Sequence, residues 1–283
     1  MKADLHCHSH YSDGTQPISH LLARAITNQV THLAITDHDC ISGLHDIPDD
    51  LTGIAIIKGV EISCQWGKIE IHVVGLHIDP NHAGLIPLLE SQQMARRRRV
   101  EMMDEKLTAL GHDGLIEYLD GLPCVAYTRS HVANYLVEQG LCKNRQKSFK
   151  THLGKGGKIY VPSQWCSLAE GVAAIRAAGG IAVLAHPGRY PLNKAKLASL
   201  VTAFETCGGE ALEGSYPNIH PNAVIQMNML ARKYGLYLSA GSDFHDPEAK
   251  WTDIGKFPPL DPTCEINIWH HPQWRLLPLS SVP

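Results

Sequence analysis

Short apolar runs alternate along the chain with segments whose apolar residues recur at helical spacing. The apolar runs predict strands, and they cover residues 2–6, 31–36, 54–60, 69–76, 181–185, 211–214 and 237–241. The helical spacing predicts helices over residues 18–28, 168–178 and 223–234. Strand–helix alternation with short connections is typical of a parallel sheet, and this number of units favours an α/β barrel.

One long segment departs from this alternation. Residues 87–161 contain no convincing barrel strand, and their pattern predicts helices over 88–110 and 130–139 and a helical turn at 148–153. We therefore expect a barrel built from residues 1–86 and 162–257, with residues 87–161 as a helical insertion that caps its mouth. The Pro-rich residues 258–283 predict an irregular tail on the surface.

The composition fits a globular protein of this size. The chain has 283 residues, of which 44% are hydrophobic and 19% are charged, and its net charge is −3 with histidine neutral. Any polyanion site must therefore be a local basic patch. No apolar run approaches the roughly 18 residues that a membrane span needs, and a histidine motif stands where a signal peptide would. We expect a cytoplasmic protein with no membrane partner, in which the eight scattered cysteines are reduced.

Candidate metal ligands gather near the ends of the apolar runs. In residues 4–9 (DLHCHS), His6 and His8 lie two positions apart, so on a strand they face the same side and can hold one ion. The other candidates are Asp13, His38, Glu61, His72, His186, Asp243 and His245. Because the carboxyl ends of barrel strands meet at one rim, this recurrence predicts a multinuclear metal site. His72 is the exception, since it lies inside its run.

These motifs together resemble the PHP (polymerase and histidinol phosphatase) family of metal-dependent phosphoesterases. The resemblance covers residues 1–80 and 165–250, and its motifs are DLHCHS and YSDG, ITDHD, HP at 186–187 and SDFH at 242–245. It implies a distorted (β/α)7 TIM-like barrel with two to three divalent ions. Within the insertion, MARRRR (94–99) and TRSHVA (128–133) resemble the branch of 3′,5′-nucleoside bisphosphate phosphatases and 5′–3′ exoribonucleases.

The resemblance also implies how the ligands are shared. A first ion would be held by His6, His8, Glu61 and Asp243. A second would be held by Glu61, His72 and His186, with Glu61 bridging, and a third by Asp13, His38 and His245. This mixture of nitrogen and oxygen ligands suits Mn²⁺, with Zn²⁺ or Fe²⁺ as alternatives, and the lack of cysteine ligands argues against a closed structural zinc site.

The expected chemistry is hydrolysis by a metal-bound water, with Glu61, Asp243 and His245 as the catalytic side chains. No Ser/His/Asp arrangement is evident in the order or spacing of the residues. Asp37 precedes His38 and is predicted to orient a ligating histidine, because ligating imidazoles usually need such a partner.

Four consecutive arginines, at 96–99, predict a second binding function. Four neighbours on a helix spread over a full turn, so at least two of them should face solvent. Because a guanidinium pairs bidentately with phosphate, we predict that Arg99 and Arg129 bind a substrate phosphate, with His131 as a further donor.

These features favour a hydrolase of phosphate esters on nucleotides or RNA 5′ ends. The alternatives are a histidinol-phosphate phosphatase, for which the basic insertion is hard to explain, and a catalytically silent metal-binding scaffold. No feature predicts an obligate protein partner.

Overall fold

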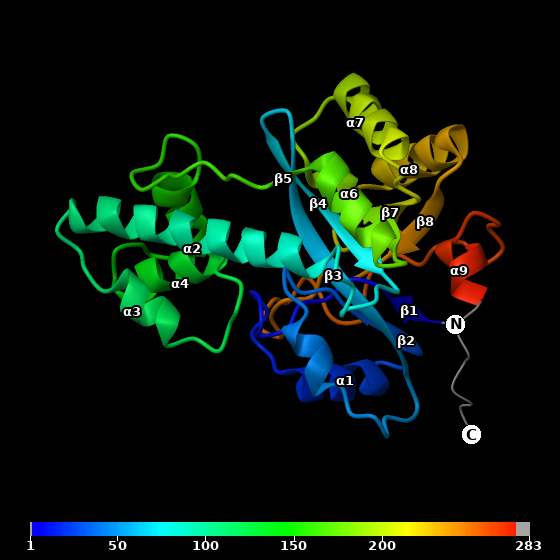
Figure 1. Ribbon diagram of the computed structural model, residues 1–283, viewed down its shortest axis with the longest axis horizontal. Helices are drawn as coiled ribbons and strands as arrows, with labels where there is room; N and C mark the ends of the chain where they lie inside the picture. Colours follow the sequence, from blue (N-terminus) through cyan, green and yellow to red (C-terminus); the bar gives the residue numbers. More distant parts are fainter. Residues whose placement is uncertain (1, 276–283) are drawn as a thin grey trace.

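A nearly closed, barrel-shaped sheet forms the centre of the protein, as seen in the computed structural model of residues 2–275 (Figure 1). The strands around it are β1 (Ala3–Asp4), β2 (His32–Ile35), β3 (Ala55–Trp66), β4 (Ile69–Leu76), β6 (Ile181–Leu184), β7 (Ala211–Ser215) and β8 (Tyr237–Ala240). A parallel bridge between Cys7 and Phe244 brings the two ends of the sheet together, and Leu5 N donates to Ala240 O at 3.0 Å. The expected α/β barrel is confirmed.

The expectation of a wholly parallel sheet is wrong at β4. This strand runs antiparallel to both of its neighbours, β3 and β6. The cause is the short turn after Trp66, where Gly67 adopts a left-handed φ of 60° and the chain re-enters the sheet at Ile69. A turn this short can join only antiparallel strands. The first residues of β4 therefore lie near the barrel mouth.

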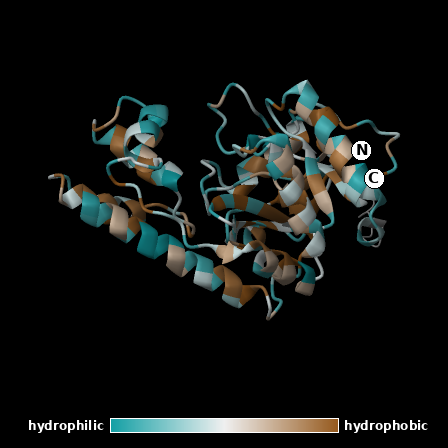
Figure 2. Ribbon diagram, turned by 90° about the horizontal axis from the view of Figure 1, so that it is seen from above, coloured by the Kyte–Doolittle hydropathy of each residue, from teal (hydrophilic) through white to brown (hydrophobic). Residues whose placement is uncertain are grey.

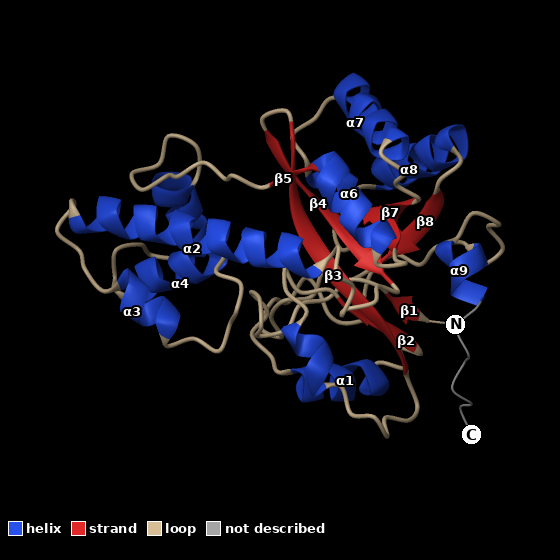
Figure 3. Cartoon of the chain, in the orientation of Figure 1, coloured by secondary structure: helices blue, strands red, loops and turns tan. Residues whose placement is uncertain are grey.

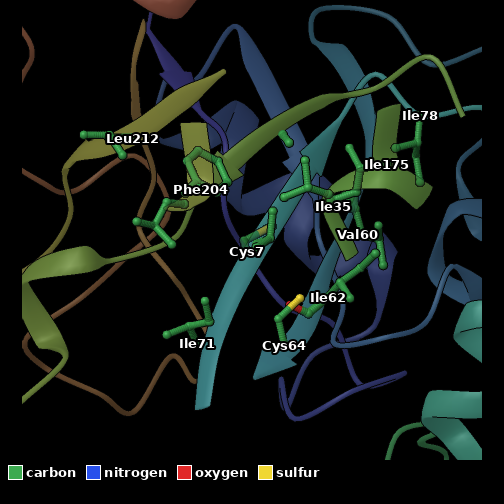
Figure 4. Packing of buried hydrophobic residues seen from close by; sticks show 14 of the residues in the cluster. Cys7, Ile35, Val60, Ile62, Cys64, Ile71, Ile78, Ile175, Phe204 and Leu212 are labelled. Carbon is green, nitrogen blue, oxygen red and sulfur yellow. The ribbon is translucent and has the colours of Figure 1, made fainter. Parts of the chain in front are cut away.

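Helices cover the outside of the barrel (Figure 3). They are α1 (Ile18–Thr27), α6 (Leu168–Ala177), α7 (Lys194–Thr206) and α8 (Pro221–Tyr234). Successive side chains of a strand alternate between two cores, as β6 shows. Ala182 and Leu184 join the core beneath the helices, whereas Ile181 and Val183 face the barrel interior. Figure 4 shows the outer core, where Val60 and Ile62 of β3 lie near Ile175 of α6.

Helix α7 was missing from the sequence prediction. Its buried side chains have helical spacing, namely Leu197, Leu200, Val201 and Phe204. Asn193 caps its first turn by accepting from Lys196 N at 2.9 Å. Both the helical spacing and the capping asparagine are visible in the sequence.

The segment between β4 and β6 forms a helical unit beside the barrel (Figure 2). It contains α2 (Ile86–Thr108), α3 (Leu115–Asp120), α4 (Arg129–Glu138), α5 (Arg145–Ser148) and a π-helical turn, η2 (Phe149–Leu153). These elements share a buried cluster of their own, which includes Met103, Leu119 and Leu136. The six-residue helix α3 was not predicted. The chain returns to the barrel through the short strand β5 (Cys166–Ser167), which pairs with β3.

The tail contributes to the barrel core, contrary to the expectation of a surface segment. Ile268 is fully buried in the interior cluster, next to residues from the amino-terminal ends of the strands such as Ala3 and Tyr237. The tail also forms short helices, η4 (Ile268–His270) and α9 (Pro272–Arg275). The rest of the predicted tail, 276–283, lies outside the described residues. Within residues 2–275, no helix has both the length and the apolar character for crossing a membrane.

Candidate metal centre and phosphate pocket

The candidate ligands converge at the barrel mouth because they lie within or just after strands that meet there. His6 and His8 come after β1, His38 after β2, His186 after β6 and Asp243 after β8. His6 and His8 are fully buried, and residues 6–8 pair with the chain after β8.

Three residues at this rim have left-handed backbones that non-glycine residues seldom adopt. Asp39, His186 and Asp243 have φ values of 46°, 31° and 48°. Such conformations cost about 1–3 kcal/mol each and persist where the surroundings hold them. Here Asp39 N donates to Glu61 O and Asp243 N donates to His6 O, both at 2.8 Å. His186 and Asp243 thereby reach the ligand cluster, whereas the Asp39 side chain turns toward Arg96.

A first cluster joins the two histidines of the N-terminal motif to two carboxylates. The Nε2 atoms of His6 and His8 lie 3.1 Å apart. Glu61 lies 3.3 Å from His6 Nε2 and 3.4 Å from His8 Nε2. Asp243 Oδ1 lies 3.5 Å and 3.3 Å from the same two nitrogens. The four residues expected to share one ion are therefore brought together.

Glu61 connects this cluster to a second one. Its Oε1 lies 3.1 Å from His72 Nδ1 and 3.2 Å from His186 Nε2, and its Oε2 lies 2.9 Å from His38 Nδ1. His72 reaches the mouth from inside its strand because β4 is antiparallel and its first half lies at this rim. His38 was expected only in the third set, but it faces Glu61 as well.

A third cluster surrounds Asp13. Its Oδ1 lies 3.1 Å from His245 Nε2 and 3.7 Å from His38 Nε2. His8 Nδ1 is 4.0 Å from the same oxygen, so His8 borders two clusters with its two nitrogens. All nine predicted ligands thus lie in one connected group, in which His38 and His8 each border a second cluster in addition to the set expected for them.

The polar atoms of this group fit divalent cations better than they fit one another. Four of them are buried and have no hydrogen-bond partner among residues 2–275: Asp13 Oδ1, Glu61 Oε2, His38 Nδ1 and His186 Nδ1. Glu61 Oε2 and His38 Nδ1 are 2.9 Å apart without forming a hydrogen bond. Buried polar atoms are rarely left unpaired in this way. Nitrogen and carboxylate donors at these separations can hold divalent metal ions.

The ionisation of the group favours the same interpretation. Burial raises the pKa of Glu61, but the surrounding histidines lower it by more than burial raises it and hold it well below its usual range. Burial lowers the pKa of His8 to about 3, so this imidazole is neutral and able to ligate. For His72 and His245, nearby carboxylates outweigh burial and raise the pKa to about 10 and about 9. Divalent cations would displace these protons on binding.

Glu213 of β7 supports the centre from behind and was missed in the sequence. Its Oε1 lies 2.8 Å from His6 Nδ1, and its Oε2 accepts from His186 N at 2.5 Å. It fixes the orientation of one candidate ligand and the backbone of another. The available signal was a glutamate inside a short apolar run, where burial of an unpaired charge would be costly.

Asp37 acts less directly than predicted. It accepts hydrogen bonds from Ser9 Oγ and Ser12 Oγ, both at 2.6 Å. Ser12 Oγ in turn lies 3.4 Å from His8 Nδ1. Asp37 therefore holds the loop beside His8, while Glu213 contacts a ligand ring itself.

A cavity of about 140 Å³ opens between the metal centre and the helical unit. His38 and His72 line one side, and Arg99 and Arg129 line the other. The two guanidinium groups lie 3.8 Å and 3.3 Å from Glu70, which also lines the cavity. Burial lowers the pKa of Arg99 to about 10, so it remains a cation at neutral pH. A basic pocket thus lies directly beside the candidate metal centre.

Only two members of the arginine run face this cavity. They are Arg96 and Arg99, three positions apart on α2. Arg97 pairs instead with Glu101 and Asp120, and Arg98 is exposed. This division matches the expectation that at least two would face solvent.

Arg96 has a structural partner that was not foreseen. Its Nε and one terminal nitrogen donate to Asp39 Oδ2 at 2.9 Å and 2.6 Å, and it also reaches Ser63 Oγ at 2.8 Å. This buried ion pair fastens α2 to the barrel rim.

His131, predicted to contact phosphate, lies behind the cavity. It is the third residue of α4 and forms a capping box with Thr128, whose amide donates to His131 Nδ1 at 3.1 Å. Burial lowers its pKa. Thr128, Arg129 and Ser130 line the cavity, and His131 is not among its lining residues.

Comparison with known proteins agrees with this geometry. The PHP domain model matches residues 4–161. The chain is 36% identical over 280 residues to a 3′,5′-nucleoside bisphosphate phosphatase of Chromobacterium violaceum, covering 97% of each. It is 38% identical over 277 residues to the 5′-3′ exoribonuclease Rnm of Escherichia coli, covering 95% of this chain and 94% of the relative. An amidohydrolase of Chromobacterium violaceum, solved with bound sulfate and no metal, superposes with a TM-score of 0.87 at 35% identity over 95% of both chains.

The chain belongs to the PHP domain family, as the sequence motifs predicted. The family model matches through the helical unit and ends before the second segment of the resemblance, residues 165–250.

Proposed function

We propose that this metal-dependent phosphoesterase cleaves the ester bond at the 3′ oxygen of a ribose whose 5′ oxygen carries a second phosphate. Its substrate would be a 3′,5′-nucleoside bisphosphate or a 5′-phosphorylated RNA end. One observation carries the proposal: a single cavity is lined by His38 and His72 on one side and by Arg99 and Arg129 on the other. Two neighbouring sites with different chemistry suit a substrate with two phosphates.

The centre would hold two to three divalent ions, and Mn²⁺ suits its donors best. Histidine nitrogens and carboxylate oxygens are ligands that Mn²⁺ accepts, and the sharing of Glu61 between neighbouring clusters suits closely spaced ions. Such ions supply an activated water and neutralise phosphate oxygens as negative charge develops. Glu61 and Asp243 would hold the ions in place. His245 would ligate a third ion or, with two ions bound, give a proton to the leaving oxygen.

Arg99 and Arg129 would bind the second phosphate. Without substrate, both arginines lie near Glu70. Burial raises the pKa of Glu70, but His72 and these two arginines outweigh burial and hold that pKa well below its usual range. A phosphate brings more negative charge and more acceptor oxygens than one carboxylate, so it can bridge both guanidinium groups. His131 has one ring nitrogen committed to the cap of α4, and we give it no direct contact.

The same bond would break in both substrate classes. Water adds to the phosphorus bound to the 3′ oxygen, the bond between phosphorus and that oxygen breaks, and the oxygen takes up a proton. A bisphosphate then yields a nucleoside 5′-monophosphate and inorganic phosphate. An RNA end yields a nucleoside 5′-monophosphate and a chain one residue shorter that again carries a 5′ phosphate. The product is therefore a substrate for the next cycle.

The alternatives explain less of the site. A histidinol-phosphate phosphatase has one phosphate to bind, which leaves the basic side of the cavity without a role. A silent scaffold would have no need for nine convergent ligands. A nucleotide-directed hydrolase whose described cysteines are all free suits the cytoplasm, a reducing compartment.

The direct test compares three substrates with Mn²⁺ present: adenosine 3′,5′-bisphosphate, histidinol phosphate and a 5′-phosphorylated RNA. We expect phosphate release from the first and nucleoside 5′-monophosphate from the third, at higher kcat/KM than for histidinol phosphate. A preference for histidinol phosphate, or no turnover of any of them, would reject the proposal.

A further inference from the structure

A second hollow adjoins the centre and has no role in the proposal above. Its volume is about 440 Å³, within the roughly 300–1,000 Å³ usual for ligand pockets. Its lining comes from the loops after β6, β7 and β8 and from the start of α8, and includes Arg189, Tyr216, Asn218, His220 and Trp251. We call it the aromatic pocket.

Arg189 connects the aromatic pocket to the metal centre. Its guanidinium contacts Asp243 Oδ2 and lies over the ring of Tyr216, 5.1 Å from the ring centre. Tyr216 is held in turn by Gly188, whose amide donates to the phenol oxygen at 2.9 Å. One wall of the pocket is therefore rigid and ends at a candidate metal ligand.

We call the cavity between the candidate metal centre and the helical unit, which is lined by Arg99 and Arg129, the cap cavity. The aromatic pocket and the cap cavity reach the centre from different sides. The cap cavity touches it through Asp13, His38 and His72, and the aromatic pocket touches it through Arg189. The two have no lining residue in common. A substrate that extends in both directions from the scissile phosphate can therefore occupy both.

The lining suits a nucleobase. Trp251 lines the pocket and is 53% exposed, so its ring is accessible to a stacking partner. Asn218 and His220 add amide and imidazole groups, and the lining residues include no aspartate or glutamate. Aromatic rings with hydrogen-bonding side chains and no negative charge are what single-stranded RNA recognition uses.

We propose that the aromatic pocket binds the nucleotide 3′ to the scissile phosphate, with its base stacked on Trp251. The assignment rests on the proposed function and extends it. A 3′,5′-bisphosphate has no such nucleotide, so the pocket distinguishes an RNA end from a mononucleotide. It gives the RNA substrate an additional contact that the two phosphates do not supply.

The experiment compares kcat/KM on two substrates, adenosine 3′,5′-bisphosphate and the 5′-phosphorylated dinucleotide pApA. Base–aromatic stacking contributes about 1–3 kcal/mol, or roughly 5- to 150-fold. We expect Trp251→Ala to lower kcat/KM on pApA by about 10-fold or more, mainly through KM, and to lower the ratio of pApA to bisphosphate activity accordingly. Trp251→Phe should restore most of that ratio. Met102→Ala, at a 41% exposed site on α2, serves as the control.

A modified substrate separates stacking from a general effect of the substitution. A dinucleotide that lacks the second base has nothing to stack on Trp251. We expect the kcat/KM of the wild-type protein to be lower on this substrate than on pApA, by the same factor by which Trp251→Ala lowers kcat/KM on pApA. Removing the base should lower the kcat/KM of Trp251→Ala only slightly. Equal losses of Trp251→Ala on both intact substrates, or no loss on pApA, would overturn the assignment while leaving the proposed function in place. Wild-type turnover of the bisphosphate without turnover of pApA would also overturn it. If the wild type cleaves neither, the proposed function fails and this assignment fails with it.

Discussion

The two sides of the cap cavity are built by different means. On the barrel side, the candidate ligands lie within or just after strands, and neighbouring strands hold the backbone, as the pairing of His38 with Glu61 illustrates. On the cap side, Arg99 and Arg129 project from two helices of a unit with its own core. Under the proposed function, hydrolysis would take place on the barrel side, where neighbouring strands fix the geometry, and the second phosphate would bind on the cap side. Substitutions on the two sides should differ in kind.

Metal removal should have the largest effect, because it empties the barrel side and leaves the cap unchanged. After chelation and dialysis we expect no measurable hydrolysis of any phosphate ester, and recovery on adding Mn²⁺. Phosphate release measures this, and bound metal is counted by elemental analysis. Full activity in a metal-free preparation would contradict the role of the barrel side.

Glu61→Gln should come next. The substitution keeps the shape of the side chain but removes the charge that links the clusters. Loss of outer partners of metal ligands typically costs about 10- to 100-fold, so loss of a shared ligand should exceed about 100-fold on every substrate. Steady-state kinetics with saturating Mn²⁺ test this, and circular dichroism checks the fold. Near-normal kcat in this variant would mean that Glu61 is not a shared ligand.

Arg129→Ala should instead depend on the substrate. Losing one charged contact to phosphate costs about 1.5–3 kcal/mol, or roughly 10- to 150-fold. We expect that loss on the bisphosphate and almost none on a simple aryl phosphate. Arg99→Ala should behave similarly. Arg98→Ala is the matched control, since Arg98 is exposed and does not line the cavity. An equal loss of kcat/KM on both substrates would mean that these arginines bind the scissile phosphate or stabilise the fold.

Glu213→Gln should show the smallest of these losses, on the barrel side. It weakens the contact that orients His6, and such partners typically contribute about 10- to 100-fold to metal affinity or activity. We expect a higher Mn²⁺ concentration to restore much of the activity on all substrates. Mn²⁺ titration of the activity measures this. A loss that excess Mn²⁺ does not reduce would mean that Glu213 acts on the reaction itself.

The barrel and the convergence of its candidate ligands were largely predictable from local patterns. A histidine or carboxylate at the end of an apolar run can be recognised without knowing the fold. His38, His186 and Asp243 all fit this rule. His72 did not fit this rule, because an apolar run looks the same in a parallel and an antiparallel strand. Its place at the rim depends on the direction of β4, which the turn at Gly67 determines.

The supporting residues depended on contacts between distant parts of the chain. Glu213 meets His6 across 207 positions, and Arg96 meets Asp39 across 57. No local pattern contains such a pair. Ile268 likewise lies in a Pro-rich segment without periodicity, and its burial in the barrel interior follows from where the chain passes after β8.

The sequence by itself determined the identity of the candidate ligands, the family and the existence of a basic helical segment. These are properties of residue type and short spacing. The tertiary structure alone decided which arginines reach the cavity, which histidines share Glu61 and where the aromatic pocket lies. The physical reason is that contacts between side chains across the barrel mouth depend on the direction of each strand, the rotation of each helix about its axis and the local backbone conformation. The spacing of residues within one element does not determine how that element is placed against another.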